Sequence, residues 1–221
     1  RIIKDGPQER RNFLDNGVSQ IKPVYNYNMS RYKKILFQRN NLLRTSKFKK
    51  DITNLLDVFD LQISKIGTSI MVERNNYVKE LSKISKMTHK QITRGSENLE
   101  LEYITNVPII DDKREMEKLY LNLMKKNTNR DLEYGTTEIG PHRDDILMSI
   151  NNNDVKVFGS QGQQRTVVLS LILSEVELIK KERGMYPVLL LDDVFSELDL
   201  DRRKYISTLF HNMQTFITLT N

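Results

Sequence analysis

The sequence predicts an α/β protein in which a helical, basic first half precedes a mixed second half that ends in a strand–helix–strand unit. Three observations support this fold class. Apolar residues in the first hundred positions recur at spacings of three and four, which is typical of packed helices. From Leu99 the pattern becomes the alternation of half-buried strands. The continuous apolar run at 188–191 indicates a parallel strand that is covered on both faces.

The first half is expected to form three helices. After the turn at Gly6-Pro7, a short helix is predicted from Glu9 to about Gln20, and it stops near Pro23. A second helix is predicted at 32–43, where an apolar face lies among basic residues. A third helix is predicted at 48–70 and continues toward Met87, with a break expected near Gly67. These apolar faces predict helices that pack on one another as a helical hairpin or small bundle, rather than a cofactor-binding motif.

The second half is expected to mix strands and helices. A strand at 99–104 precedes a helix at 113–130. An antiparallel hairpin is predicted between 145–150 and 155–158, because the Asn/Asp run between these segments is typical of a turn. The remaining predicted elements are a helix at 163–181, a strand at 188–191, a helix at 201–213 and a strand at 215–220. The last three form a βαβ unit, which requires a parallel sheet.

Charge divides the chain at the same place as the change of pattern. Residues 1–98 carry a net charge of +11 and residues 99–221 carry −5, within a total of +6. We therefore predict two domains, a basic helical arm at 1–98 and a second domain at 99–221. A basic surface suits a polyanion such as nucleic acid, and the alternative is an ordinary solvated helix face.

Composition excludes several classes of protein. The chain has no cysteine, which removes a disulfide scaffold, a cysteine-ligated zinc site and a thiol nucleophile. Its three histidines are scattered, so a histidine-rich metal site is not expected. The sequence contains no run of eighteen apolar residues, so no membrane-spanning helix is predicted.

Two adjacent acids, Asp192 and Asp193, follow the apolar run at 188–191. The carboxyl edge of a parallel sheet is where α/β proteins bind ligands. Neighbouring carboxylates repel each other unless a cation or proton lies between them, and Mg²⁺ held with substrate phosphates fits that requirement. The alternative is that both acids cap the turn that follows.

Two serine-containing turns flank these acids. Gly159–Gln163 precedes an amphipathic helix, where small residues and the N–H groups of a helix start attract an anion. Ser196–Asp199 lies three residues beyond the acids. Each serine, taken alone, also fits a plain N-cap.

Together and in this order, the three motifs resemble the ABC-type ATPase head. Ser160–Gln163 resembles its signature motif, Asp192-Asp193 its Walker B acids and Ser196–Asp199 its D-loop. The departures are Gln161, where the signature usually has glycine, and Asp193, where the second acid is usually Glu.

The residues around these motifs resemble those of the RecF family of bacterial recombination mediators. The segments that carry the resemblance are GPHRDD at 140–145, FGSQGQQRT at 158–166 and LLDDVFSELD at 190–199, with GPQERRNFLD at 6–15 and YKKILFQRN at 32–40 in the helical part. The implied fold is the carboxyl-terminal half of an ABC-type ATPase head, with a parallel sheet and an antiparallel hairpin, and with a helical arm inserted into it.

The resemblance also implies roles for particular residues. Asp192 would hold Mg²⁺, and Asp193 would be the catalytic residue that orients or deprotonates the attacking water. Ser160, Gln161, Gly162 and Gln163 would contact ATP bound to the other protomer. Ser196 and Asp199 would form the D-loop that couples the two sites. The basic candidates for DNA binding are Arg31, Lys33, Lys34, Arg39 and Arg44.

At the level of the protein, the resemblance implies a weak, DNA-dependent ATPase that forms an ATP-dependent homodimer on double-stranded or gapped DNA. It would assist RecA loading with RecR-like mediators in replication, recombination, repair and the SOS response, in the cytoplasm and without a membrane.

One expected motif is missing from the sequence. No glycine is followed by lysine, so the G-x-x-x-x-G-K-[ST] loop that cradles the β- and γ-phosphates is absent. The resemblance places that loop upstream of the arm, and we expect a fragment that begins after it. Such a fragment holds about half of an ATP site and is expected to be inactive alone.

Three questions stay open from the sequence. The chain could instead be another SMC-like head of the same superfamily, although such heads have a longer coil. It could be a metal-dependent nuclease that uses Asp192 and Asp193, although nuclease sites of that type place their acids differently. The segment His142–Asp145 could contact nucleotide or DNA, or could fix the turn before a strand.

Overall fold

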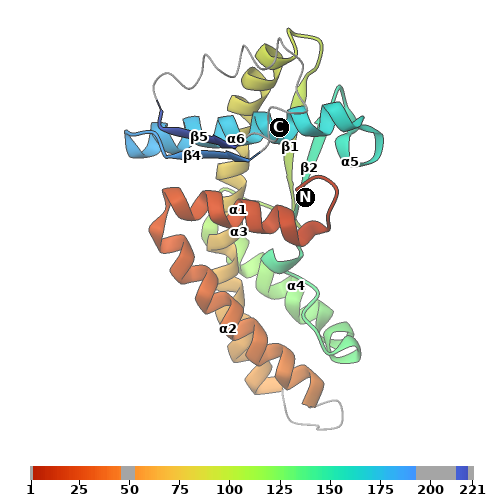
Figure 1. The fold of residues 1–221 in the computed structure, drawn as a ribbon. Coiled ribbons are helices and arrows are strands. Elements are labelled where there is room, and N and C mark those ends of the chain that lie inside the picture. The colour runs from red at the N-terminus through yellow and green to blue at the C-terminus, as the bar shows by residue number, and fades with distance from the viewer. Residues whose placement is uncertain (1, 46–52, 193–212, 219–221) are drawn as a thin grey trace. The chain divides into compact units, whose positions relative to one another are not determined.

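The computed structural model describes residues 2–45, 53–192 and 213–218, and it confirms the predicted α/β class. Figure 1 shows the elements, which in order are α1 (Pro7–Ile21), α2 (Pro23–Thr45), α3 (Thr53–Ile92), β1 (Leu99–Ile104), α4 (Lys113–Tyr134), the 3₁₀ turn η1 (Pro141–Arg143), β2 (Asp145–Ile150), β3 (Asn153–Asp154), α5 (Val155–Phe158), α6 (Gln161–Arg183), β4 (Leu189–Asp192) and β5 (Thr215–Thr218). The strands form one sheet in the order β1-β2-β3 and a second in the order β4-β5. No helix of the described ranges is long and apolar enough to cross a membrane.

The chain divides into two compact units. The first, called here the helical unit, contains residues 7–77 and 103–146. The second, called the sheet unit, contains residues 1–6, 78–102 and 147–221. These limits differ from the predicted division at residue 98, because residues 103–146 group with the helices of the first half. The division into an arm and a head stays a prediction.

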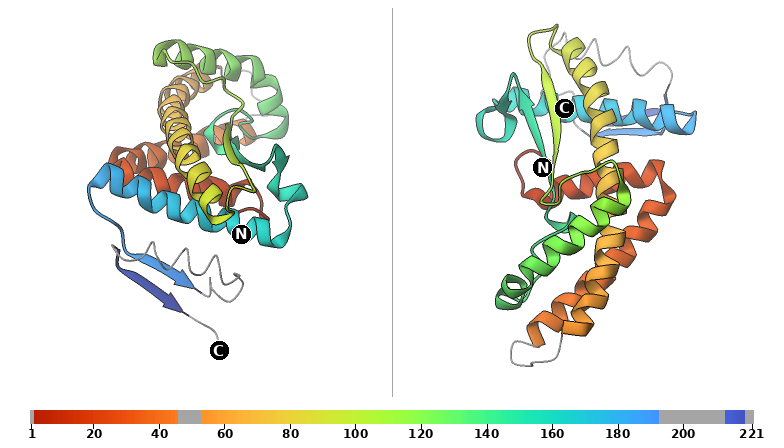
Figure 2. Two further views of the ribbon diagram at one scale, coloured as in Figure 1. Left: turned by 90° about the horizontal axis from the view of Figure 1, so that it is seen from above. Right: turned by 180° about the vertical axis from the view of Figure 1, so that it is seen from behind.

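Helix α3 continues through Gly67 without the expected break. Inside the helical unit, a side chain at position 67 would meet the ring of Tyr120, since a Cβ would lie only 2.7 Å from Tyr120 Cε1 and 3.3 Å from an atom of Tyr32. Glycine is therefore a packing requirement here rather than a helix breaker. Figure 2 shows the amino-terminal half of α3 beside α2 in both views.

The predicted hairpin is present but is shorter than expected. Strand β2 pairs antiparallel with β3, with Ser149 opposite Asp154 and Ile150 opposite Asn153. The turn residues Asn151 and Asn152 have φ of 49° and 66°, as a tight hairpin turn requires. The prediction that 155–158 forms the second strand is wrong, because this segment is α5. The side chain of Asp154 accepts a hydrogen bond from Lys156 N, and this cap starts a helix instead.

Strands β4 and β5 pair in parallel, as predicted for the βαβ unit. The helix predicted between them lies outside the described residues. One face of the pair packs on α6, where Val176 and Ile172 contact Leu189 and Leu191. On the other face Leu190 is 73% exposed to solvent, and the predicted covering of this face stays a prediction.

Candidate functional site

The predicted signature turn lies at the amino-terminal end of α6, in the sheet unit. Ser160 is the N-cap, and its Oγ accepts a hydrogen bond from Gln163 N at 3.2 Å. In return, the side chain of Gln163 accepts from Ser160 N, with 2.9 Å between Oε1 and N. This is a capping box, so the N-cap interpretation of Ser160 is confirmed. The cap uses the lone pairs of the Ser160 hydroxyl and does not use its proton.

Glycine is suited to positions 159 and 162 of this turn for two different structural reasons. A Cβ at Gly159 would lie 2.5 Å from the carbonyl oxygen of Val155, so a larger residue cannot fit there without a shift. A Cβ at Gly162 would meet no atom within 4 Å, so the space in front of it is open. Helix geometry leaves the N–H groups of Gln161 and Gly162 for an external acceptor. The turn therefore fits an anion such as a phosphate, while the contact itself stays a prediction.

The predicted acidic site falls partly outside the described residues. Asp192 is the last residue of β4, where its backbone pairs in register with Thr218. Asp193, Ser196 and Asp199 lie outside the described ranges, so their catalytic and D-loop roles stay predictions. In the part of the chain that the structure describes, no group of three or more histidine or acidic residues could hold a metal ion.

The segment at 140–145 lies inside the helical unit rather than in the sheet unit. Asp144 is fully buried and accepts hydrogen bonds from Arg74 Nη1, at 3.1 Å, and from the hydroxyl of Tyr103. Burial raises the pKa of Asp144, and the nearby Arg74 opposes that rise. Asp145 pairs through both oxygens with Arg10, at 2.5 and 2.8 Å. Of the interpretations that the sequence left open, these contacts favour the structural one.

His142 belongs to the same buried network. Its Nε2 lies 2.7 Å from the carbonyl oxygen of Thr137 and therefore carries the proton, while Nδ1 accepts from the hydroxyl of Tyr32 at 2.7 Å. Gly140, which has a φ of 131°, allows this packing, since a Cβ there would lie 1.9 Å from the hydroxyl oxygen of Tyr120. The segment thus ties η1 to α2 and α4.

A pH dependence of stability is expected from His142. Burial lowers its pKa from the usual 6.5 to about 4. As the pH falls below about 6.5, the unfolded chain therefore takes up the proton before the folded chain does, and the free energy of unfolding decreases until the pH reaches about 4. Between pH 7 and pH 4.5, the free energy of unfolding measured with urea should fall by about 2–3 kcal/mol more in the parent than in His142→Gln. Equal losses in the two proteins would contradict the buried, neutral imidazole.

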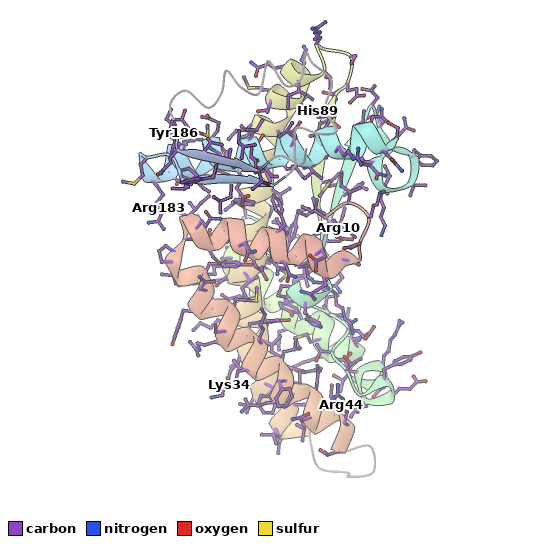
Figure 3. All side chains as sticks on the ribbon, viewed as in Figure 1. Arg10, Lys34, Arg44, His89, Arg183 and Tyr186 are labelled. Atoms are coloured by element: carbon purple, nitrogen blue, oxygen red, sulfur yellow. The ribbon has the colours of Figure 1, made fainter. Side chains whose placement is uncertain are left out.

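The predicted basic residues of α2 divide into exposed and buried ones. Arg31, Lys33 and Lys34 are exposed, and Figure 3 shows Lys34 and Arg44 on this helix. Arg44 is also exposed, with Nε 3.2 Å from the carbonyl oxygen of Gly135.

Arg39 corrects the prediction of a DNA-contacting residue. Its side chain is fully buried, with Nε 2.6 Å from Asp60 and Nη1 2.7 Å from Asp131. Two carboxylates in the interior of the helical unit neutralise and enclose this guanidinium. Its place in the sequence gave no sign of burial, because these partners lie 21 and 92 residues away.

Sequence reasoning also missed a second buried arginine, Arg74. It contacts Asp15 and the carbonyl oxygen of Pro141, with distances of 2.7 and 2.6 Å, as well as Asp144. The available signal was its position in α3 between the apolar residues Met71 and Tyr77, where a charged side chain requires buried partners.

Comparisons with known proteins give a consistent result. No protein-family model matches the chain. DNA replication and repair protein RecF of Clostridium botulinum (strain ATCC 19397 / Type A) is 47% identical over 220 residues, and that of Clostridium novyi (strain NT) is 45% identical over 220 residues. RecF of Alkaliphilus oremlandii (strain OhILAs) is 47% identical over 224 residues. Each match covers the whole chain and 59–60% of the relative.

Solved structures agree with these relatives. The structure of the recombination mediator protein RecF-ATP in the RecFOR pathway superposes with a TM-score of 0.92 at 37% identity, and it covers all of this chain and 59% of that chain. The structure with ATPrS gives a TM-score of 0.91 at the same identity. The chain thus spans about three fifths of the length of the proteins it matches. The chain thus resembles RecF in sequence along its whole length, and its described parts resemble RecF in fold.

Proposed function

We propose that this chain provides the signature side and the Walker B strand of a RecF-type ATPase that binds DNA and acts in recombinational repair. The observation that carries the proposal is the start of α6, where a capping box and an open glycine present N–H groups to an acceptor. Its support from outside the chain is the RecF-ATP structure, which has the same fold over this region.

ATP would be bound between two protomers. Ser160, Gln161 and Gly162 are exposed, so the signature turn presents its N–H groups at the surface. The resemblance to the ABC-type head places the phosphate-cradling loop elsewhere on the head, so a phosphate at this turn would come from nucleotide held by a second head. Such a pairing closes with two-fold symmetry and encloses two nucleotides at one interface. Ser160 would donate its hydroxyl proton to the γ-phosphate, and Gly162 would let the backbone approach it.

The residues around the end of β4 would complete the site. Asp192 is proposed to hold Mg²⁺, which would neutralise phosphate charge during transfer. Asp193 would orient the attacking water, and Ser196 and Asp199 would connect the two sites of the dimer. Without the phosphate loop, the 221 residues by themselves are expected to turn over no ATP. In bacteria the complete protein would act in the cytoplasm with RecR-like mediators and RecA.

The exposed face of α2 is proposed to bind the DNA backbone. This helix has no acidic residue, and its exposed cations extend from Arg31 to Arg44, which is about 20 Å along the helix axis. Lysine and arginine contacts to phosphates give binding that depends little on sequence and weakens with salt. The face would thus hold double-stranded or gapped DNA without reading its bases.

Replacing Lys33 and Lys34 together by glutamine should weaken duplex binding by the complete protein. The plot of log affinity against log salt should become less steep by about 1.8, because each lost phosphate contact contributes about 0.9. Fluorescence anisotropy with ATP at several salt concentrations measures both quantities.

A matched control removes two lysines from α4. Lys118 pairs with Glu115 and Lys125 with Asp57, at 3.0 and 3.3 Å. Their replacement by glutamine should leave the slope unchanged. If both pairs of substitutions lower the slope equally, the binding reflects overall charge, and the α2 face is not the DNA site.

A further inference from the structure

The loop between α3 and β1 contributes a carboxylate to the signature turn. Glu97 lies in this loop, and each of its two oxygens has a separate partner in the sheet unit. Oε1 accepts a hydrogen bond from Nε2 of Gln163 at 3.1 Å, and Oε2 lies 2.9 Å from Nε2 of His89. Glu97 therefore connects the end of α3 with the capping box of α6.

His89 holds the carboxylate from the other side. Its side chain is fully buried, and its second nitrogen, Nδ1, lies 2.9 Å from the hydroxyl of Ser170 in the third turn of α6. Figure 3 labels His89 on α3, near the crossing with α6. Because its imidazole contacts Glu97 and α6 at once, Glu97 is kept at a fixed distance from the helix that begins at the signature turn.

The contact with Glu97 determines which way the amide of Gln163 faces. One end of that amide must accept from Ser160 N to close the capping box, and the other end can only donate. A carboxylate beside the donating end favours this orientation and disfavours the flipped one, in which two acceptors would face each other. Hence the conformation of Ser160 depends on Glu97 through Gln163.

We propose that Glu97, held by His89, is a positioning residue that preorganises the signature turn to receive a nucleotide phosphate. The proposal rests on the proposed function, since it concerns the same site. In this proposal Gln163 connects the capping box to Glu97, a contact that the residue at position N3 of an ordinary helix does not make. With Glu97 present, the Ser160 hydroxyl and the N–H groups of Gln161 and Gly162 face the acceptor before it arrives, so less free energy of binding is used to order them.

Three variants of the complete RecF-type protein test this inference. Glu97→Ala removes the acceptor, and Glu97→Gln keeps one amide oxygen for Gln163 while removing the charge. Glu100→Ala is the matched control, because Glu100 is an exposed carboxylate of β1 that pairs with Lys86 at 3.1 Å. Circular dichroism and thermal unfolding first establish that all three variants are folded.

The first measurement is amide hydrogen exchange of the segment 158–165, which needs no nucleotide. Losing a charged hydrogen-bond partner should speed exchange of the Ser160 amide about tenfold in Glu97→Ala, with a smaller change in Glu97→Gln and none in Glu100→Ala. Exchange equal to that of the parent in Glu97→Ala overturns the positioning role, whatever the protein does with ATP.

The second measurement is ATP-dependent dimerisation. Glu97→Ala should bind ATP as a monomer with parental affinity and dimerise about tenfold more weakly, and Glu97→Gln should recover most of that loss. If the parent does not dimerise with ATP, the proposed function fails while the exchange result still decides the positioning role. If the parent dimerises and Glu97→Ala matches it, the inference fails and the proposed function stands.

Discussion

Replacing Arg39 by methionine is expected to destabilise the protein by about 3–5 kcal/mol, because the change removes one partner of a buried charge cluster. Arg39, Asp60 and Asp131 have side-chain exposures of 0%, 2% and 1%. The variant would leave two carboxylates facing each other in the interior with no cation between them. Burial already raises the pKa of Asp60, and without Arg39 its carboxyl would have to be protonated to remain there.

Urea unfolding at pH 7 measures this loss directly, and Arg44→Met is its matched control. Arg44 lies on the same helix but is exposed, so its substitution should change the free energy of unfolding by less than about 0.5 kcal/mol. Adding Asp60→Asn and Asp131→Asn to Arg39→Met should restore part of the stability, since it removes the unpaired charges. A loss in Arg39→Met no larger than in Arg44→Met would contradict the buried cluster.

Elements with a strong local pattern could be predicted from the sequence. The helices at 7–21 and 161–183 appear within a few residues of the predicted limits, because apolar spacing and end signals are properties of the segment itself. The parallel pairing of β4 and β5 was predictable for a related reason, since a strand, a crossover and a second strand have one favoured arrangement.

Features that depend on distant partners could not be predicted. Arg39 lies among Lys33, Lys34 and Arg44 in the sequence, and only the carboxylates at 60 and 131 turn it inward. The Asn/Asp run at 151–154 suggested a turn followed by a second strand at 155–158, but the cap at Asp154 started α5. Tertiary context and capping outweighed the local pattern in both cases.

The position of the signature-like turn could be predicted from the sequence, whereas the residues that support the turn could not. The turn at 160–163 was identified from residue type and spacing, and the structure places it at the start of α6 as predicted. Its link to Glu97 and His89 was not identified, because those residues precede it by more than sixty positions. Short motifs reveal the residues that meet a ligand, whereas the residues that hold them are distributed over the fold.

Replacing Ser160 by glutamate in the complete protein should prevent ATP-dependent dimerisation while leaving ATP binding by the monomer intact. The new carboxylate would face the γ-phosphate of the second protomer, and like charges at such an interface should weaken dimerisation at least about 100-fold, or about 2.8 kcal/mol. Folding should be little affected. The lost N-cap costs about 1 kcal/mol, and a negative charge at a helix start is itself favourable.

Two further substitutions separate charge from shape at this position. Ser160→Thr keeps the hydroxyl and the N-cap, so it should dimerise like the parent. Ser160→Arg fills the space that the phosphate needs, but it also offers a positive charge to the phosphate. Weak dimerisation by the arginine variant would indicate that space matters, and parental dimerisation would indicate that the charge compensates.

Light scattering of the complete protein with ATP and Mg²⁺ tests the central claim, that α6 presents its signature turn to nucleotide on a second protomer. The molar mass of the parent and of Ser160→Thr should double when ATP is added. The mass of Ser160→Glu should remain that of a monomer, although isothermal titration shows parental ATP affinity. Doubling of the mass of Ser160→Glu at the same protein and ATP concentrations would contradict the account and would leave Ser160 with its N-cap role alone.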